Sequence, residues 1–140
     1  MKHMARLLAI AVTMLPLLAT AQMGEHSRLI AQVPFEFVAG NRIVPAGQCI
    51  VQSAGGGAAV LISQANAKVS LFSMVTPAGS QKGAGIDALV FHKYGNTYFL
   101  TELRVSGNRA TYELPESKAE AELRAQNAPA QETILLASLK

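Results

Sequence analysis

The sequence has few of the residues from which disulfides, metal sites and charged surfaces are built. Its 140 residues contain no tryptophan, one cysteine and three histidines, and 15% are charged. An average soluble chain has about 25% charged residues, and so low a charge content argues against a disordered chain. Aromatic residues make up only 6%, whereas half of the residues are hydrophobic and 11 are glycine. This balance is typical of a single turn-rich β domain built from small aliphatic side chains.

The first 21 residues have the pattern of a secretory signal peptide. Lys2, His3 and Arg6 precede an apolar run from residue 7 to residue 18, and Ala19-Thr20-Ala21 fits the cleavage site. The run has about 12 residues, whereas a membrane-spanning helix needs about 20, so we expect no stable membrane anchor after cleavage. The pattern predicts export, to the periplasm or out of the cell, after cleavage near Ala21.

Cleavage also changes the charge of the protein. Removing Lys2 and Arg6 from the 12 basic residues leaves ten against nine acidic residues, so the formal net charge falls from +3 to +1. A nearly neutral chain without a basic cluster is not expected to bind nucleic acid.

Alternation and turn residues predict strands after the leader. In Val33-Pro34-Phe35-Glu36-Phe37 every second residue is large and apolar, which places three such side chains on one face of a strand. We expect this strand to span about residues 29–38, and Pro34 predicts that it lies at a sheet edge or carries a bulge. Gly40-Asn41 and Pro45-Ala46-Gly47 predict tight turns after it.

The clearest hairpin spans residues 88–103. Its two-residue turn, Gly95-Asn96, places Tyr94 opposite Thr97 and Phe91 opposite Leu100. Further strands are predicted at residues 42–44, 48–54, 58–63, 68–75 and 109–114.

Two segments between these strands have a less regular pattern. In the strand predicted at 68–75, Phe72, Met74 and Val75 blur the alternation set by the residues before them. Residues 76–85 contain one proline and three glycines and are interpreted as the longest loop.

The sequence as a whole predicts an all-β fold: a small antiparallel β-sandwich or open barrel of about seven or eight strands with a short C-terminal helix. After the signal peptide we expect a flexible leader at 22–28, the β domain at 29–114 and the helix at 115–127. Residues 128–140 are a tail or a final strand. Pro115 suits a first helical position, and the following residues are good helix formers.

Cys49 is the only cysteine, so the chain cannot form an internal disulfide. Cys49 shares one face of its predicted strand with Val51, which favours a small buried side chain over a reactive thiol or an intermolecular bridge. The three glycines at 55–57 are a turn and not a phosphate loop, since no Lys-Ser/Thr follows them.

The remaining chemistry is sparse. Only His26 and His92 are left after cleavage, and neither belongs to a cluster with metal-ligand spacing. A Cys49–His92 nucleophile–base pair can be written, but no third group orients it. No G-x-S-x-G motif occurs. The remaining candidates are scattered carboxylates for a glycosidase pair, and basic and aromatic residues for a surface patch. These residues are Glu36, Asp87, Glu102 and Glu113, and Lys93, Tyr94, Tyr98 and Arg104, respectively.

Three stretches resemble a family of small uncharacterised exported proteins abundant in acidobacterial genomes. They are residues 33–47, residues 89–100 and residues 113–120, and the resemblance covers most of Val33 to Ala125. It implies a signal peptide and a compact β domain, and it implies no activity, ligand or catalytic residue. Cys49 lies where such proteins more often have a polar or aromatic residue.

Three functions remain open at this stage. The first is a non-enzymatic module of the cell envelope, which binds an envelope protein or itself through a sheet edge. The second is a binder of a small apolar ligand inside a β-barrel. The third is a hydrolase that uses Cys49 or His92. We take the first as the prediction, without catalytic residues, cofactor or metal.

Overall fold

The computed structural model describes residues 28–81 and 85–140, so the predicted signal peptide and the residues up to Ser27 lie outside the described part of the chain. The described residues form β-strands, one α-helix and one 3₁₀ turn. In chain order these are β1 (Arg28–Val33), β2 (Phe37–Ala39), β3 (Arg42–Val44), β4 (Gly47–Ala54), η1 (Gly55–Gly57), β5 (Ala59–Gln64), β6 (Ser70–Met74), β7 (Thr76–Ser80), β8 (Ala88–Tyr94), β9 (Thr97–Val105), β10 (Ala110–Glu113), α1 (Lys118–Ala125), β11 (Gln131–Leu136) and β12 (Ser138–Leu139).

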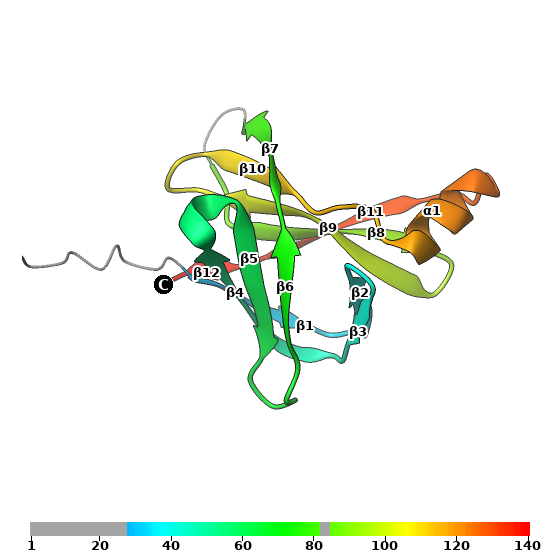
Figure 1. Ribbon diagram of the computed structural model, residues 1–140, viewed down its shortest axis with the longest axis horizontal. Helices are drawn as coiled ribbons and strands as arrows, with labels where there is room; N and C mark the ends of the chain where they lie inside the picture. Colours follow the sequence, from blue (N-terminus) through cyan, green and yellow to red (C-terminus); the bar gives the residue numbers. More distant parts are fainter. Residues whose placement is uncertain (1–27, 82–84) are drawn as a thin grey trace, which may run out of the picture.

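The strands form two sheets packed face to face (Figure 1). Sheet A has the order β12-β1-β4-β5-β6. Sheet B has the order β11-β8-β9-β10-β7, and β2 is added parallel to β9 with β3 antiparallel to β2. The predicted all-β sandwich with a short C-terminal helix is confirmed, and the described strands do not close into a barrel.

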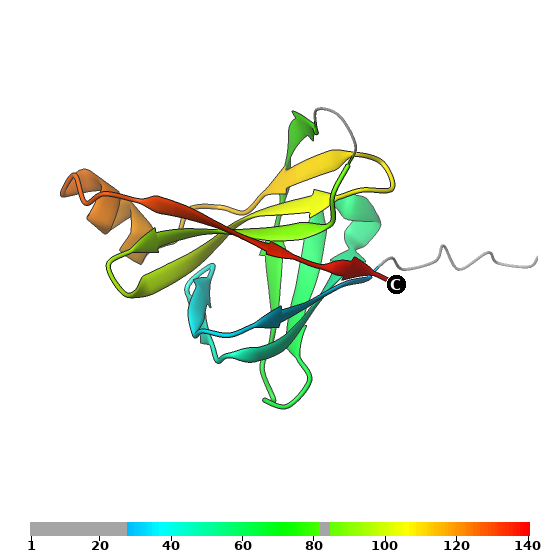
Figure 2. The same ribbon diagram turned by 180° about the vertical axis from the view of Figure 1, so that it is seen from behind.

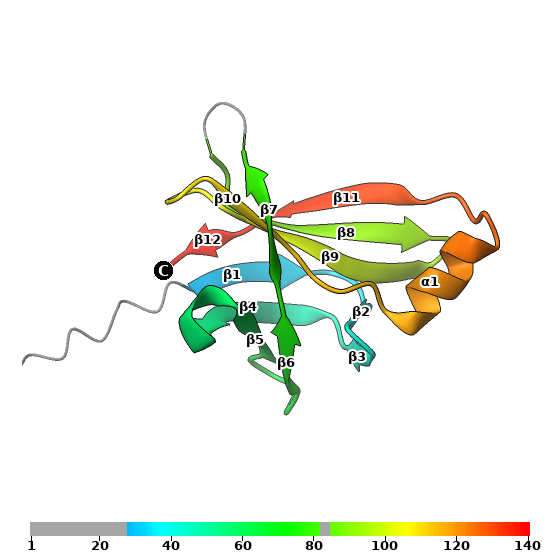
Figure 3. The ribbon, with the colours of Figure 1, turned by 45° about the horizontal axis from the view of Figure 1, so that its top comes forward.

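Two strand paths pass from one sheet to the other. The β6–β7 path leaves sheet A at Val75 and continues in sheet B (Figure 3). The β11–β12 path passes from sheet B to sheet A (Figure 2). The change occurs at Ala137, whose N–H donates to the carbonyl of Asp87 at 2.8 Å. Strands that change sheets make the corners of such sandwiches. Here they leave β6 and β11 at opposite edges of different sheets.

The strand predicted at 29–38 is two strands in different sheets. β1 ends at Val33, and β2 begins at Phe37 in sheet B. Pro34, which has no N–H for a sheet, lies in the connection between them. The expectation of an edge position was wrong, because β1 lies between β12 and β4. Val33 and Phe37 are nevertheless both buried in the same core.

Aromatic rings fill one end of the core. Phe35 stacks on Tyr98 with ring centroids 3.6 Å apart, and both Phe35 and Phe37 meet the edge of Phe91 at 5.1 Å. Edge-to-face and offset arrangements are the favourable ones for aromatic pairs. These rings come from the β1–β2 connection, β2, β8 and the start of β9, so they tie sheet B to the chain that leaves sheet A.

The hairpin β8–β9 has the predicted register, with Tyr94 opposite Thr97 and Phe91 opposite Leu100. Gly95 has φ 60°, which its turn requires. The segment interpreted as the longest loop is partly a strand, because residues 76–80 form β7 and pair with β10. Proline and glycine there mark an edge strand with a bulge, not a loop.

Helix α1 lies within the range predicted as helical. The Ser117 hydroxyl caps it by accepting a hydrogen bond from the Glu120 N–H at 3.1 Å. Asn127, with φ 55°, follows its last turn. Of the two options for the C-terminal residues, the structure has strands, β11 and β12, and the carbonyl of Lys140 accepts from the N–H of Arg28 at 2.8 Å.

Candidate functional site

The exposed large apolar side chains gather on strands at sheet edges. Six such residues are exposed in the described part of the chain, and five of them lie on β3, β6 or β11. They are Ile43, Phe72, Met74, Ile134 and Leu136. Single exposed apolar residues are ordinary, but their concentration on edge strands marks surfaces where another strand can add.

Every second residue of β6 directs its main-chain N–H and C=O groups to the free edge of sheet A. The N–H of Gln64 donates to the carbonyl of Val69, and the N–H of Val75 donates to the carbonyl of Ala58. Bonded pairs alternate along an antiparallel ladder, so the intervening residues of β6 direct their N–H and C=O groups away from β5. These are residues 70, 72 and 74, and they include the exposed Phe72 and Met74.

The outer face of sheet A continues this apolar surface inward from its edge. Phe72 lies opposite Leu61 of β5, and Met74 lies opposite Ala59. Phe72 is 72% exposed and Met74 63%, so neither is covered by its neighbours. Arg42 of β3 reaches the edge at one end, where its Nη1 donates to the carbonyl of Ser70 at 3.4 Å.

The other edge strands carry devices that discourage strand addition. β7 contains Pro77 and pairs with β10 through a bulge. β12 has two residues, and β3 has three, of which one is Arg42. β11 carries Glu132, which lies 3.9 Å from Arg104. Short strands, charge, proline and bulges are the means by which proteins protect sheet edges. β6 has five residues, Ser-Leu-Phe-Ser-Met, and none of these devices.

A second region is an acidic hollow of about 300 Å³ where α1 meets the strands of sheet B. Glu120 of α1 is only 5% exposed there. Its Oε1 lies 3.0 Å from His92 Nδ1 and accepts a hydrogen bond from the Tyr94 hydroxyl at 3.4 Å. Among residues 28–81 and 85–140, no group of three or more His, Cys, Asp or Glu side chains is arranged to hold a metal ion. Through its contacts with His92 and Tyr94, Glu120 links α1 to the hairpin β8–β9.

Electrostatics at this hollow support the same structural role. Arg124 donates two hydrogen bonds to Glu116, at 2.7 and 3.0 Å, and the bond lowers the pKa of the Glu116 carboxyl. The pKa of Tyr94 is raised, first by burial and then by the Glu120 carboxylate. Tyr94 is thus held as a neutral hydroxyl that donates to Glu120, which is the opposite of what a base would need.

Cys49 is fully buried on the inner face of β4, as its alternation with Val51 predicts. Burial raises the pKa of its thiol to about 12. A thiol that stays protonated and out of contact with solvent is inert, since the thiolate is the nucleophile.

The structure does not assemble a Cys49–His92 pair. The two residues lie in different sheets, and the His92 ring bonds to Glu120 instead. His26 lies outside the described residues. Glu36 is exposed between β1 and β2, and the Asp87 carboxylate accepts two hydrogen bonds from Ser106.

The other candidate residues are brought together only in part. Glu102 and Glu113 lie opposite each other on β9 and β10, but Arg104 pairs with Glu102 at 2.6 Å. The Lys93 ammonium lies 5.3 Å from the centroid of Tyr98. Tyr94 is instead buried toward Glu120, so the four residues form no single basic and aromatic patch.

Sequence reasoning missed both the free edge and the Glu120 contacts. The signal for the edge was the blurred alternation at Phe72 and Met74, because a strand with apolar residues on both faces has more apolar surface than one sheet can bury. Glu120 gave no signal, since its burial depends on where α1 meets the hairpin.

No helix in the described part of the chain is long and apolar enough to cross a membrane. Comparisons with known proteins add no assignment: no family model, no curated protein and no solved structure matches this chain significantly.

Proposed function

We propose that this protein is a non-enzymatic module that assembles by pairing the free edge of β6 with the same edge of a second copy. One observation carries the proposal. Among the edge strands of the described residues, β6 alone combines exposed large apolar side chains with the absence of charge, proline, bulge or shortening. Such an edge is a template for strand addition.

The geometry of β6 suits an antiparallel pair related by a two-fold axis, in which both copies use the same surface. The residues that face the free edge are Ser70, Phe72 and Met74, so the axis falls at Phe72. Phe72 then lies opposite Phe72 of the second copy, and Ser70 lies opposite Met74. Residues opposite each other in this way exchange both main-chain hydrogen bonds, and their side chains lie on one face.

The charges around β6 permit this pairing. No charged residue occurs between Lys68 and Gln81, and no acidic residue occurs from Phe37 to Ile86. In the two-fold arrangement Lys68 aligns with Thr76 of the second copy. Like charges opposite each other destabilise a strand pair, and no charged residue of the strand is opposed to another. The Arg42 guanidinium, which donates to the Ser70 carbonyl at this edge, must share or release that carbonyl when the second strand adds.

The expected association is weak and reversible. A contact between two five-residue strands is smaller than the roughly 1,200 Å² at which standard stable interfaces begin. The assembly therefore depends on local concentration. We propose, from the pattern of residues 1–21, that the protein acts in the periplasm or outside the cell. Export would bring copies together there.

Sedimentation velocity on the chain from Gln22 to Lys140, over micromolar to millimolar concentrations, tests the proposal. We expect a monomer–dimer equilibrium that Phe72→Glu weakens about 30-fold or more, since losing the aromatic pair and opposing two carboxylates together cost about 2 kcal/mol. Ile86→Glu is the matched control, because Ile86 is exposed but lies outside the strands.

Two outcomes would contradict the proposal. One is a wild-type chain that stays monomeric throughout the concentration range. This holds even if the chain binds a strand of a different protein. The other is an equal loss of association in Phe72→Glu and Ile86→Glu when circular dichroism shows both variants folded.

A further inference from the structure

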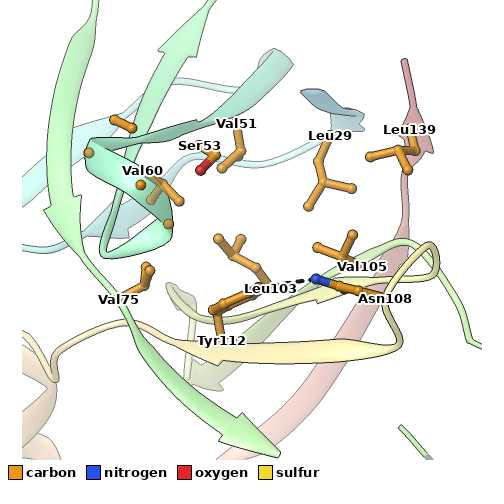
Figure 4. Close-up of a pocket in the computed structure, with 14 residues that line it drawn as sticks. Leu29, Val51, Ser53, Val60, Val75, Leu103, Val105, Asn108, Tyr112 and Leu139 are labelled. Atoms are coloured by element: carbon orange, nitrogen blue, oxygen red, sulfur yellow. Dashed lines mark hydrogen bonds between the residues drawn. The ribbon is translucent and has the colours of Figure 1, made fainter. Parts of the chain in front are cut away.

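We propose that the cavity between the two sheets binds a small, neutral and mainly apolar molecule that has one hydrogen-bonding group. The cavity has a volume of about 400 Å³, and Leu29, Val51, Leu103 and Val105 point into it from the two sheets (Figure 4). It is lined by the start of β1 and the ends of β4 and β9, whereas the aromatic rings lie beyond the end of β1 and at the start of β9. A volume of this size is in the range of small-molecule sites, roughly 300–1,000 Å³.

Several of the side chains that line the cavity are small. The lining includes Val51 and Ser53 of β4, Val60 of β5 and Val75. At the other end of the core the space between the sheets is filled by phenylalanine rings. Protein interiors are usually packed as densely as organic crystals, with few voids larger than a water molecule. This space opens to solvent, since Ser53, Gly55 and Asn108 of its lining are exposed, and its mainly apolar walls suit an apolar guest.

The mouth of the cavity is bordered by η1, whose three residues are all glycine. Gly55, Gly56 and Gly57 have φ values of 57°, 70° and 92°, a region that other residues rarely adopt, and a Cβ on any of them would meet nothing within 4 Å. The border is therefore bare backbone, and no side chain on it obstructs entry. The turn at Asn108 borders the other side.

The lining defines the chemistry of the guest. No charged side chain lines the cavity, and its polar side chains are Ser53, Asn108 and Tyr112. Asn108 Nδ2 donates to the Tyr112 hydroxyl at 3.3 Å and Asn108 Oδ1 accepts from the Ala110 N–H at 3.0 Å, which fixes an amide and a phenol beside each other at the exposed rim of the cavity. Leu29, Leu103 and Val105 form the apolar interior. A phosphate or carboxylate would find no cation here, whereas a neutral hydroxyl or amine has partners.

This inference is independent of the β6 edge. The cavity residues point between the sheets, while Phe72 points out of the outer face of sheet A. Phe72→Glu should therefore leave ligand binding unchanged, and filling the cavity should leave association through β6 unchanged.

The test is a fluorescence titration of the chain from Gln22 with N-phenyl-1-naphthylamine, a neutral apolar probe with one N–H. We expect saturable binding that Val60→Phe weakens about tenfold or more by filling the cavity. Leu61→Phe is the matched control and should change the affinity less than about twofold, because Leu61 is the next residue of β5 and faces outward.

A second variant covers the case in which Val60→Phe does not fold. Ser53→Leu adds apolar volume at an exposed position of the lining, and it should also weaken the probe about tenfold. Competition by 1-octanol, but more weakly by octanoate, is the expected order for a site without a cation. The inference is overturned if the probe shows no saturable binding, if Ser53→Leu and Val60→Phe bind it as the wild type does, or if octanoate competes better than 1-octanol.

Discussion

The edge strands β6 and β11 share a backbone arrangement and differ in charge. Ala137 and every second residue before it bond to β8. The main-chain groups of residues 132, 134 and 136 therefore point to the free edge of β11, as those of residues 70, 72 and 74 do on β6. Both sets include exposed apolar side chains. The set on β11 also includes Glu132, which lies near Arg104, whereas the set on β6 contains no charge. We therefore expect the Glu132 carboxylate to be the main difference in how readily the two edges add a strand.

The largest expected difference between the two edges concerns their central residues. Phe72→Glu should weaken association about 30-fold or more, as argued above, whereas Ile134→Glu on β11 should leave it within about twofold. Both residues are exposed and central on their strands. Sedimentation velocity of the two variants at one concentration makes the comparison, and equal loss in both would show that β6 is not the special edge.

Removing the carboxylate from β11 should open a second edge. In Glu132→Leu the free-edge set of β11 becomes entirely apolar, so we expect species larger than dimers at high concentration. Light scattering coupled to size exclusion measures this, with Glu122→Leu on the exposed side of α1 as the control for lost charge. If Glu132→Leu behaves as Glu122→Leu does, charge does not protect β11.

The hydrogen bonds of Glu120 should matter for β11 and not for β6. Glu120→Gln loses the charge that strengthens the contacts to His92 and Tyr94, and we expect a loss of about 1–2 kcal/mol in the free energy of unfolding. Helix α1 precedes β11 by a short connection. Hydrogen exchange should therefore speed up at residues 131–134 and stay unchanged at 70–74. Faster exchange at both edges, or at neither, would contradict this role.

Thiol reactivity offers the smallest but most local comparison. Native Cys49 should be unreactive at neutral pH, since burial raises its thiol pKa to about 12. In a Cys49→Ala background, a thiol introduced by Met74→Cys should become less reactive as protein concentration rises, because the paired edge covers it. One introduced by Leu136→Cys should not change. Labelling rates with a disulfide reagent at several protein concentrations measure both, and concentration dependence at Leu136→Cys would argue for pairing through β11.

The sequence predicts local pairing well where the turn decides it. Gly95-Asn96 allows a two-residue turn, and that turn fixes the pairing of β8 and β9 from Tyr94–Thr97 to Phe91–Leu100. Beyond Phe91 the register shifts by one residue, which the turn does not predict. Alternation also identifies the buried face at Cys49, because side chains of a strand point to opposite faces.

The sequence does not predict which strands become neighbours. Alternation in residues 29–38 is compatible with one strand, but the structure divides the segment between two sheets at Pro34. The same limit applies to β6, which lies at an edge because the next strand, β7, belongs to sheet B. It applies also to the cavity, because its lining residues come from strands that are distant in the sequence. The described residues form twelve strands in place of the predicted number of about seven or eight, because segments such as 29–38 and 70–80 are divided between the two sheets.

The pairing of β6 about a two-fold axis is tested most directly by exchanging charge at Phe72. Phe72→Glu and Phe72→Lys each place like charges opposite each other in the pair, so we expect both variants alone to sediment as monomers. An equimolar mixture places glutamate opposite lysine, and we expect the dimer to form again. A mixture that remains monomeric while both variants are folded would contradict the pairing of Phe72 with Phe72 of a second copy.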